Sequence, residues 1–166
     1  MNKSKLNSIS RQLITLQESN DYSLFQFKSL VSSHQYSRLY QLILNTLPSG
    51  SAILDWGCGN GHFSYFLANQ GYQTFGFSFE DFPLRHTLNN LDYSFTKGNI
   101  EQPKRLPYQD AEFDAVVSVG VLEHVRETGG NEISSLQEIT RILKPGGLFI
   151  SFPQEDSRHS FSWSVR

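Results

Sequence analysis

Hydrophobic positions along the chain change from a helical spacing to a strand-like spacing and back several times. Apolar residues recur every three or four positions over residues 36–47, which predicts a helix that ends at Pro48-Ser49-Gly50. The continuous apolar run Ala52-Ile53-Leu54 then predicts a short buried strand. Residues 1–35 are mostly polar and carry only a weak helical stripe, so we expect a helical or partly disordered segment there.

The remainder of the chain repeats this alternation. Further strands are predicted at residues 72–77, 93–95, 113–119 and 148–152, and helices at residues 62–69, 83–91 and 133–143. Short apolar strands that alternate with helices are typical of a parallel sheet that is covered on both faces. We therefore predict an α/β fold with a doubly wound, mostly parallel sheet.

Composition narrows the kind of protein. A chain of 166 residues is long enough for one domain, and its single cysteine cannot form an internal disulfide. The formal charge of −2 lacks the basic excess of dedicated nucleic-acid-binding proteins, so no nucleic-acid partner is expected. Neither a secretory signal nor a run of about 18 apolar residues, as a membrane span needs, is present. We expect a cytoplasmic protein without a membrane span.

A glycine-rich turn follows the first predicted strand, with the sequence Asp55-Trp56-Gly57-Cys58-Gly59-Asn60-Gly61. Glycines permit positive φ and let a ligand approach the backbone closely. The N-terminus of the next helix offers unpaired N–H groups, and Asp55 supplies a charge that attracts an ammonium group. Taken alone, the motif fits a purely structural turn equally well. Its place between a strand and a helix favours a ligand site.

A nucleotide-like ligand also requires polar side chains about 20 residues further on, which bind the ribose hydroxyls. Ser78 and Glu80 lie in that window, at the end of the second predicted strand. The same residues also suit a solvated helix N-cap. Both interpretations remain open on the sequence.

Four ordered segments carry a resemblance to a known family. They are residues 53–61 (ILDWGCGNG), Leu106-Pro107-Tyr108 with Phe113-Asp114, Val121-Leu122-Glu123-His124-Val125, and Leu143-Lys144-Pro145-Gly146-Gly147. In these motifs the chain resembles the class I S-adenosylmethionine-dependent methyltransferases, in particular the bacterial small-molecule type. The resemblance covers residues 36–153 and implies a Rossmann-like fold and S-adenosyl-L-methionine as the cofactor.

The resemblance also implies roles for single residues. Those expected at the cofactor are Asp55, Gly57, Cys58 and Gly59 at the methionine part, Ser78 and Glu80 at the ribose, Asn99 and Ile100 at the adenine, and Ser118 and Val119 beside the sulfonium. His124 is the candidate base for the methyl acceptor, and Glu123 is expected to orient it or to bind the acceptor. Because these two are the only candidate ligands there, we expect no metal.

Two departures from the family pattern bear on function. Ser78 stands where the family usually has an acidic residue, and a hydroxyl lacks the bidentate grip of a carboxylate. The core, residues 36–166, is expected to be truncated after its fifth strand, with an open sheet edge that a second copy or a partner chain would cover. The expected activity is methyl transfer to a small molecule such as a sugar, a lipid-linked compound or a metabolite hydroxyl. The alternative is a non-catalytic or partner-dependent remnant of the fold.

Overall fold

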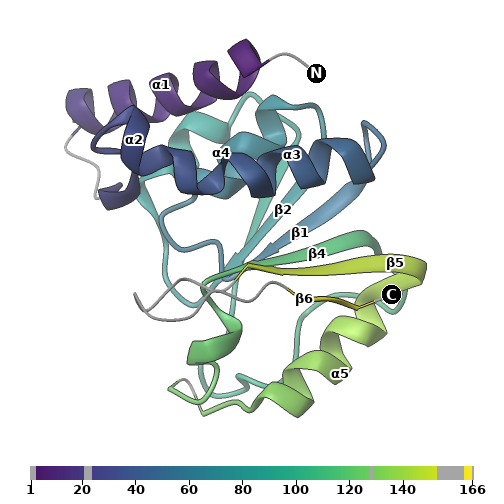
Figure 1. The fold of residues 1–166 in the computed structure, drawn as a ribbon. Helices are drawn as coiled ribbons and strands as arrows, with labels where there is room; N and C mark the ends of the chain where they lie inside the picture. Colours follow the sequence, from purple (N-terminus) through teal and green to yellow (C-terminus); the bar gives the residue numbers. More distant parts are fainter. Residues whose placement is uncertain (1–2, 21–23, 128, 153–162, 166) are drawn as a thin grey trace.

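Strands and helices alternate along the chain as predicted, and the strands form one central sheet. A computed structural model describes residues 3–20, 24–127, 129–152 and 163–165. Within them lies a six-stranded sheet in the order β3-β2-β1-β4-β5-β6 (Figure 1). The strands are β1 (Ala52–Trp56), β2 (Gln73–Ser78), β3 (Tyr93–Lys97), β4 (Phe113–Val119), β5 (Leu143–Phe152) and β6 (Trp163–Val165). The first five pair in parallel, which confirms the predicted doubly wound α/β fold.

Helices cover both faces of the sheet. On one face lie α1 (Lys3–Asn20), α2 (Leu30–Ser33), α3 (Ser37–Thr46) and α4 (His62–Asn69), and on the other lies α5 (Glu132–Ile142), as Figure 1 shows. Short 3₁₀ helices are η1 (Phe25–Phe27), η2 (His34–Tyr36), η3 (Pro83–Leu88) and η4 (Leu122–His124). No helix in the described part of the chain is long and apolar enough to cross a membrane.

Strand β1 is buried on both faces, and its alternation assigns each side chain to one layer. Ile53 belongs to the hydrophobic cluster beneath α1 to α4, whereas Leu54 and Trp56 belong to the cluster beneath α5. Successive side chains of a strand point to opposite faces, so Asp55 lies on the same side as Ile53. Asp55 and Trp56, at the end of β1, therefore lie on opposite faces of the sheet.

The described part of the predicted N-terminal segment, residues 1–35, packs against this core. Ile9 and Leu13 of α1 are buried, and so are Leu24 and Phe27 further along. All four belong to the cluster that contains Ile53 of the sheet. The weak helical stripe in the sequence thus corresponds to a helix held by burial of a few apolar side chains.

Strand β5 and its edge differ from the prediction. β5 starts at Leu143 rather than at residue 148, because Leu143 pairs with Phe113 and the register then shifts across residues 144–147. β6 pairs antiparallel with residues 149–151 of β5. The parallel part of the sheet thus ends at its fifth strand, and the short β6, which the sequence pattern did not predict, forms the edge beside it. A three-residue strand gives too short a pattern to be recognised from sequence, and residues 153–162 of the predicted core lie outside the described residues.

Candidate functional site

The glycine turn at the end of β1 depends on the absence of side chains. Gly57, Gly59 and Gly61 have φ angles of +74°, +50° and +83°, a region that other residues rarely adopt. A Cβ on Gly57 would overlap the Val121 side chain, and one on Gly61 would overlap the Phe82 ring. A Cβ on Gly59 would find no atom nearer than the Gly57 carbonyl oxygen, 3.9 Å away. The turn thus combines two close-packed glycines with one that presents bare backbone to open space.

Hydrogen bonds fix the turn against β2. The N–H groups of Gly57 and Cys58 both donate to the Phe77 carbonyl oxygen, at 2.8 and 2.9 Å. The Gly61 N–H donates to the Cys58 carbonyl at 2.8 Å, immediately before α4 begins. The Cys58 side chain is buried beneath the turn, and burial raises the pKa of its thiol. Cys58 therefore contributes packing, and its thiol stays protonated near neutral pH.

Asp55 lies beneath the turn on the α4 side of β1. Its carboxylate is 1% exposed and accepts a hydrogen bond of 2.6 Å from the Ser64 hydroxyl of α4. Burial raises the pKa of Asp55 to about 7, while the Ser64 hydrogen bond lowers it in part. Asp55 therefore holds a proton more readily than an exposed aspartate does, and it is directed at Ser64 rather than at solvent.

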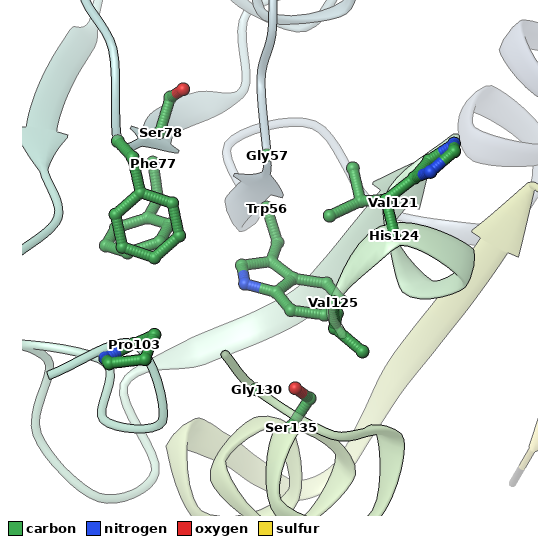
Figure 2. Close-up of a pocket in the computed structure, with 11 residues that line it drawn as sticks. Trp56, Gly57, Phe77, Ser78, Pro103, Val121, His124, Val125, Gly130 and Ser135 are labelled. Atoms are coloured by element: carbon green, nitrogen blue, oxygen red, sulfur yellow. The ribbon is translucent and has the colours of Figure 1, made fainter. Parts of the chain in front are cut away.

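A pocket of about 110 Å³ opens on the α5 side of the same turn (Figure 2). Its lining residues come from the ends of β1 and β2, from the loops that follow β2, β3 and β4, and from the start of α5. They are Trp56, Gly57, Phe77, Ser78, Phe79, Pro103, Val121, His124, Val125, Gly130 and Ser135. Ligands in doubly wound sheets bind at the carboxyl ends of the strands, which is where this pocket lies.

Three of the predicted site residues line this pocket: Gly57, Ser78 and His124. Ser78 also accepts a hydrogen bond of 3.3 Å from the Glu80 N–H through its hydroxyl. Glu80 itself is exposed and does not line the pocket. The expectation that Glu80 joins Ser78 is therefore not supported here, because β2 ends at Ser78 and the chain turns away.

The predicted adenine neighbours, Asn99 and Ile100, do not line the pocket either. The Asn99 side chain accepts a hydrogen bond of 2.9 Å from the Glu101 N–H, and Ile100 is 66% exposed. Phe79 and Pro103 line it instead. Their contribution depends on how the loops after β2 and β3 fold back.

Trp56 is the largest wall residue that the sequence analysis did not identify (Figure 2). Asp55, its predicted neighbour in the site, lies on the opposite face of the same strand. The signal that identifies Trp56 is the alternation itself, because the residue after Asp55 must face the α5 layer.

Ser118 and Val119, at the end of β4, lie on opposite faces. Ser118 pairs in register with Trp56, and its buried hydroxyl has no hydrogen-bond partner among the described residues. Val119 is half-buried against the cluster on the other face. A buried hydroxyl without a partner costs free energy, so Ser118 is a group that a polar ligand at this edge would satisfy.

His124 is paired with a residue that the sequence analysis did not consider. Its Nδ1 lies 2.7 Å from Oε1 of Glu127, one helical turn further on, and both side chains are exposed. This hydrogen bond is the main cause that raises the pKa of His124 above its ordinary value. Glu123 is exposed and does not line the pocket, and the carboxylate that contacts the His124 ring is that of Glu127. The arrangement suits proton transfer, because the carboxylate fixes the ring and leaves Nε2 as the second basic nitrogen.

Comparisons with known proteins agree with this geometry. A family model described as a methyltransferase domain matches residues 54–151. The chain is 32% identical over 128 residues to a tRNA (carboxymethyluridine(34)-5-O)-methyltransferase of Arabidopsis thaliana, over 73% of this chain and 29% of that protein. It is 25% identical over 125 residues to a probable S-adenosylmethionine-dependent methyltransferase of Mycolicibacterium smegmatis, over 73% of this chain and 46% of that protein.

A solved structure supports the same relationship. It is a putative methyltransferase from an antibiotic biosynthesis pathway of Anabaena variabilis, with 25% identity and a TM-score of 0.55. The match covers 70% of this chain and 45% of that one. The chain thus spans less than a third of its Arabidopsis relative and less than half of its mycobacterial one.

These relatives correct one expectation. The exclusion of a nucleic-acid partner is wrong, because several similar proteins are named as tRNA methyltransferases. Net charge sums over the whole chain and says little about a local surface beside a site. Because the match runs from the glycine turn to the last parallel strand, the chain belongs to the methyltransferase domain family, and its cofactor is S-adenosyl-L-methionine.

Proposed function

We propose that this chain transfers a methyl group from S-adenosylmethionine to a nucleotide of tRNA. The observation that carries the proposal is the alignment with the Arabidopsis tRNA methyltransferase, at 32% identity over 128 residues. In this proposal the bare glycine turn holds the methionine part of the cofactor. The pocket beneath it, between Trp56 and Phe79, holds the adenosine part.

Three features of the structure support this cofactor placement. Gly59 presents backbone without a Cβ to open space, so a ligand can approach the turn closely. Trp56 and Phe77 give the pocket flat apolar walls that suit a purine ring. The unpartnered hydroxyl of Ser118 supplies a buried polar group at the end of β4, and Ser78 supplies a hydroxyl for the ribose.

When bound, S-adenosylmethionine supplies an electrophilic methyl group on a positively charged sulfur. The task of the chain is to hold the acceptor in line with that group, and to remove a proton where the acceptor carries one. In our proposal His124 Nε2 accepts this proton, and Glu127 holds the imidazole through Nδ1. Glu127 is then a positioning residue, and its negative charge stabilises the imidazolium that forms.

Cofactor binding is the first test. Titration calorimetry of the purified chain with S-adenosylhomocysteine is expected to show one site. Absence of binding at millimolar ligand would contradict the proposal and leave the non-catalytic or partner-dependent remnant as the alternative.

Acceptor identity is the second test. Total tRNA is incubated with the chain and S-adenosylmethionine that carries a radioactive methyl group, and the RNA is then precipitated. We expect label in the tRNA, which nuclease digestion converts to labelled nucleosides. His124→Asn serves as the control and is expected to incorporate at most about 1% as much label, as general base catalysis contributes roughly 10²–10⁴-fold.

A small-molecule acceptor is the second candidate, and one observation favours it. The Anabaena structure, which is similar over 70% of this chain, is described as belonging to an antibiotic biosynthesis pathway. In this case label would appear in sugar, lipid-linked or metabolite hydroxyl acceptors, while tRNA would remain unlabelled. That result would overturn the tRNA proposal and leave the cofactor proposal intact.

A further inference from the structure

The segment between β3 and β4 builds one side of the pocket, and α5 holds it in place. Pro103 of this segment lines the pocket. Leu106 is buried in the same cluster as Trp56. The Tyr108 ring packs edge-on against Phe77, with ring centroids 6.4 Å apart. The position of residues 103–108 therefore decides the shape of this wall.

Two side chains of α5 bind the backbone of this segment. The Leu106 N–H donates to Oε2 of Glu138 at 2.9 Å. Arg141 donates to the Leu106 carbonyl at 3.0 Å and to the Tyr108 carbonyl at 2.8 Å. Both the donor and the acceptor of Leu106 are thus bound from the same helix.

The Arg141 guanidinium has no unused donor. Besides the two backbone carbonyls, it donates twice to Glu138, at 2.9 and 2.8 Å, and once to Asp110, at 2.9 Å. These five bonds account for all five N–H groups of an arginine. The side chains of Arg141 and Glu138 are 26% and 20% exposed, so the pair is partly shielded from water. Arg141 also keeps the pKa of Glu138 below its ordinary value, which maintains the acceptor in its charged form.

Attachment of α5 to the sheet does not require these side chains. Ile139 and Ile142 of α5 are buried in the core beneath it. The carbonyls of Arg141 and Ile142 accept backbone hydrogen bonds from Ala111 and Glu112, at 2.9 and 2.8 Å. The Arg141 and Glu138 side chains add hydrogen bonds to the backbone of residues 106–108.

We propose that Glu138 and Arg141 act as positioning residues for the cofactor, by fixing the segment between β3 and β4 as a preformed wall of its pocket. The inference rests on the proposed cofactor placement and is independent of the acceptor. A preformed wall spares the cofactor the entropic cost of ordering the segment on binding. We call the bonds from Glu138 and Arg141 to residues 106–108 the clamp. Its loss is expected to weaken cofactor binding more than it weakens the fold.

The test compares Arg141→Lys with a matched control, Arg126→Lys. Lysine keeps the charge but lacks the planar fork that reaches two carbonyls and a carboxylate together. Arg126 precedes α5 and forms an ion pair of 2.8 Å with Glu132, the first residue of that helix. Its side chain is 75% exposed, and its hydrogen bond and ion pair go to Glu132 rather than to residues 106–108. We expect the dissociation constant of S-adenosylhomocysteine to rise about tenfold in Arg141→Lys and to stay unchanged in Arg126→Lys.

Backbone amide exchange provides a readout that a general loss of stability would not reproduce. In Arg141→Lys, exchange at Leu106, whose N–H donates to Glu138, is expected to accelerate, while exchange in β1 and β4 stays near the wild-type rate. Glu138→Gln, which keeps an oxygen for the Leu106 N–H, is measured as well and is expected to weaken binding about threefold. If Arg141→Lys does not fold, the affinity of Glu138→Gln serves as the test instead.

The outcomes separate the two proposals. Failure of the wild-type chain to bind S-adenosylhomocysteine overturns the cofactor placement. Wild-type binding together with unchanged affinity in folded Arg141→Lys or Glu138→Gln overturns the clamp alone. A uniform acceleration of exchange across the sheet would also overturn it, because it would show that the pair serves global stability.

Discussion

At the scale of single residues, the pairing of His124 with Glu127 makes a direct prediction about pH. The hydrogen bond to Glu127 raises the pKa of His124, and a base works only in its neutral form. We expect kcat/KM to rise with pH through a midpoint above the ordinary histidine value of about 6.5. In Glu127→Gln the midpoint should move to lower pH, and NMR titration of the His124 ring should show the same shift.

A control and a contrary outcome complete this test. His86→Gln alters an exposed histidine of η3 and is expected to leave the pH profile unchanged. If the profile of Glu127→Gln coincides with that of the wild type, His124 is not the base that the profile reports.

Because Asp55 is buried with a raised pKa, we expect the free energy of unfolding to fall as the pH rises. Its pKa is raised to about 7 in the native state, against about 3.9 for an unperturbed aspartate. Between these values the native state binds more protons than the unfolded state, so the free energy of unfolding decreases as pH rises from about 4 to 7. Asp55→Asn keeps an acceptor for Ser64 and removes the ionisation. Urea unfolding at pH 5 and 8 should show a drop of roughly 2–3 kcal/mol in the wild type and a much smaller drop in the variant.

Parallel stability curves for the wild type and Asp55→Asn would contradict this account of Asp55. They would indicate that the buried carboxylate finds compensation for its charge in the native state.

A substitution at Ser78 is expected to strengthen cofactor binding. Ser78 lines the pocket, and its hydroxyl already accepts the Glu80 N–H, which leaves it one donor and one acceptor site for the ribose. A carboxylate has more acceptor sites and makes stronger hydrogen bonds. We expect Ser78→Asp to tighten S-adenosylhomocysteine binding by roughly three- to tenfold in calorimetry. Weaker or unchanged binding would show that the ribose lies elsewhere.

The pocket residues that could be predicted from the sequence are those that belong to a short local motif. Gly57 was predicted because a turn between a strand and a helix needs its positive φ, and His124 because its motif is a local one. Pro103 and Glu127 depend on how a loop returns to the sheet and on which rotamer a surface carboxylate adopts. Such contacts arise from tertiary packing, which periodicity does not encode.

At the scale of elements, the glycine turn gives a prediction with an internal control. Gly57 and Gly50 have similar φ angles, +74° and +80°, so alanine at either position meets a similar backbone cost of about 1 kcal/mol. Only at Gly57 would the new Cβ also overlap Val121, because nothing lies within 4 Å of a Cβ on Gly50. Urea unfolding should therefore show Gly57→Ala to be less stable than Gly50→Ala by roughly 1–3 kcal/mol.

The double variant Gly57→Ala with Val121→Ala tests the cause of that difference. Removal of the overlapping side chain is expected to recover part of the lost stability, as coupled neighbours are non-additive. Strict additivity would assign the cost of Gly57→Ala to the backbone alone.

Element boundaries follow the sequence where a turn signal and burial agree. α3 ends at Thr46, directly before the predicted stop, because Pro48 cannot continue a helix. At residues 144–147 the same kind of signal misleads. There the glycines mark a register shift inside β5, whose pairing with β4 resumes at Leu148.

At the scale of the whole molecule, the fold was predictable since strand and helix alternation determines a doubly wound sheet. The sequence did not predict which face of the sheet carries the pocket and which buries Asp55. One face buries Asp55 under α4, while the other places Trp56 over α5 and opens the pocket, and both residues come from the same strand. The exclusion of a nucleic-acid partner failed because the total charge of −2 carries no information about a surface beside this pocket.

The cofactor is expected to stabilise the whole molecule. A ligand that binds only the native state adds a free energy of RT ln(1 + [L]/Kd), about 2.7 kcal/mol at a concentration of 100 Kd. For a domain of this size that corresponds to a rise in Tm of roughly 5–10 °C, which calorimetry with S-adenosylhomocysteine can measure. Gly57→Ala should lower both the starting Tm and the rise, whereas Gly50→Ala should lower only the former, because nothing lies near its added Cβ. An equal rise in both variants would place the cofactor away from the glycine turn, and no rise in the wild type at millimolar ligand would mean that the fold persists here without its cofactor.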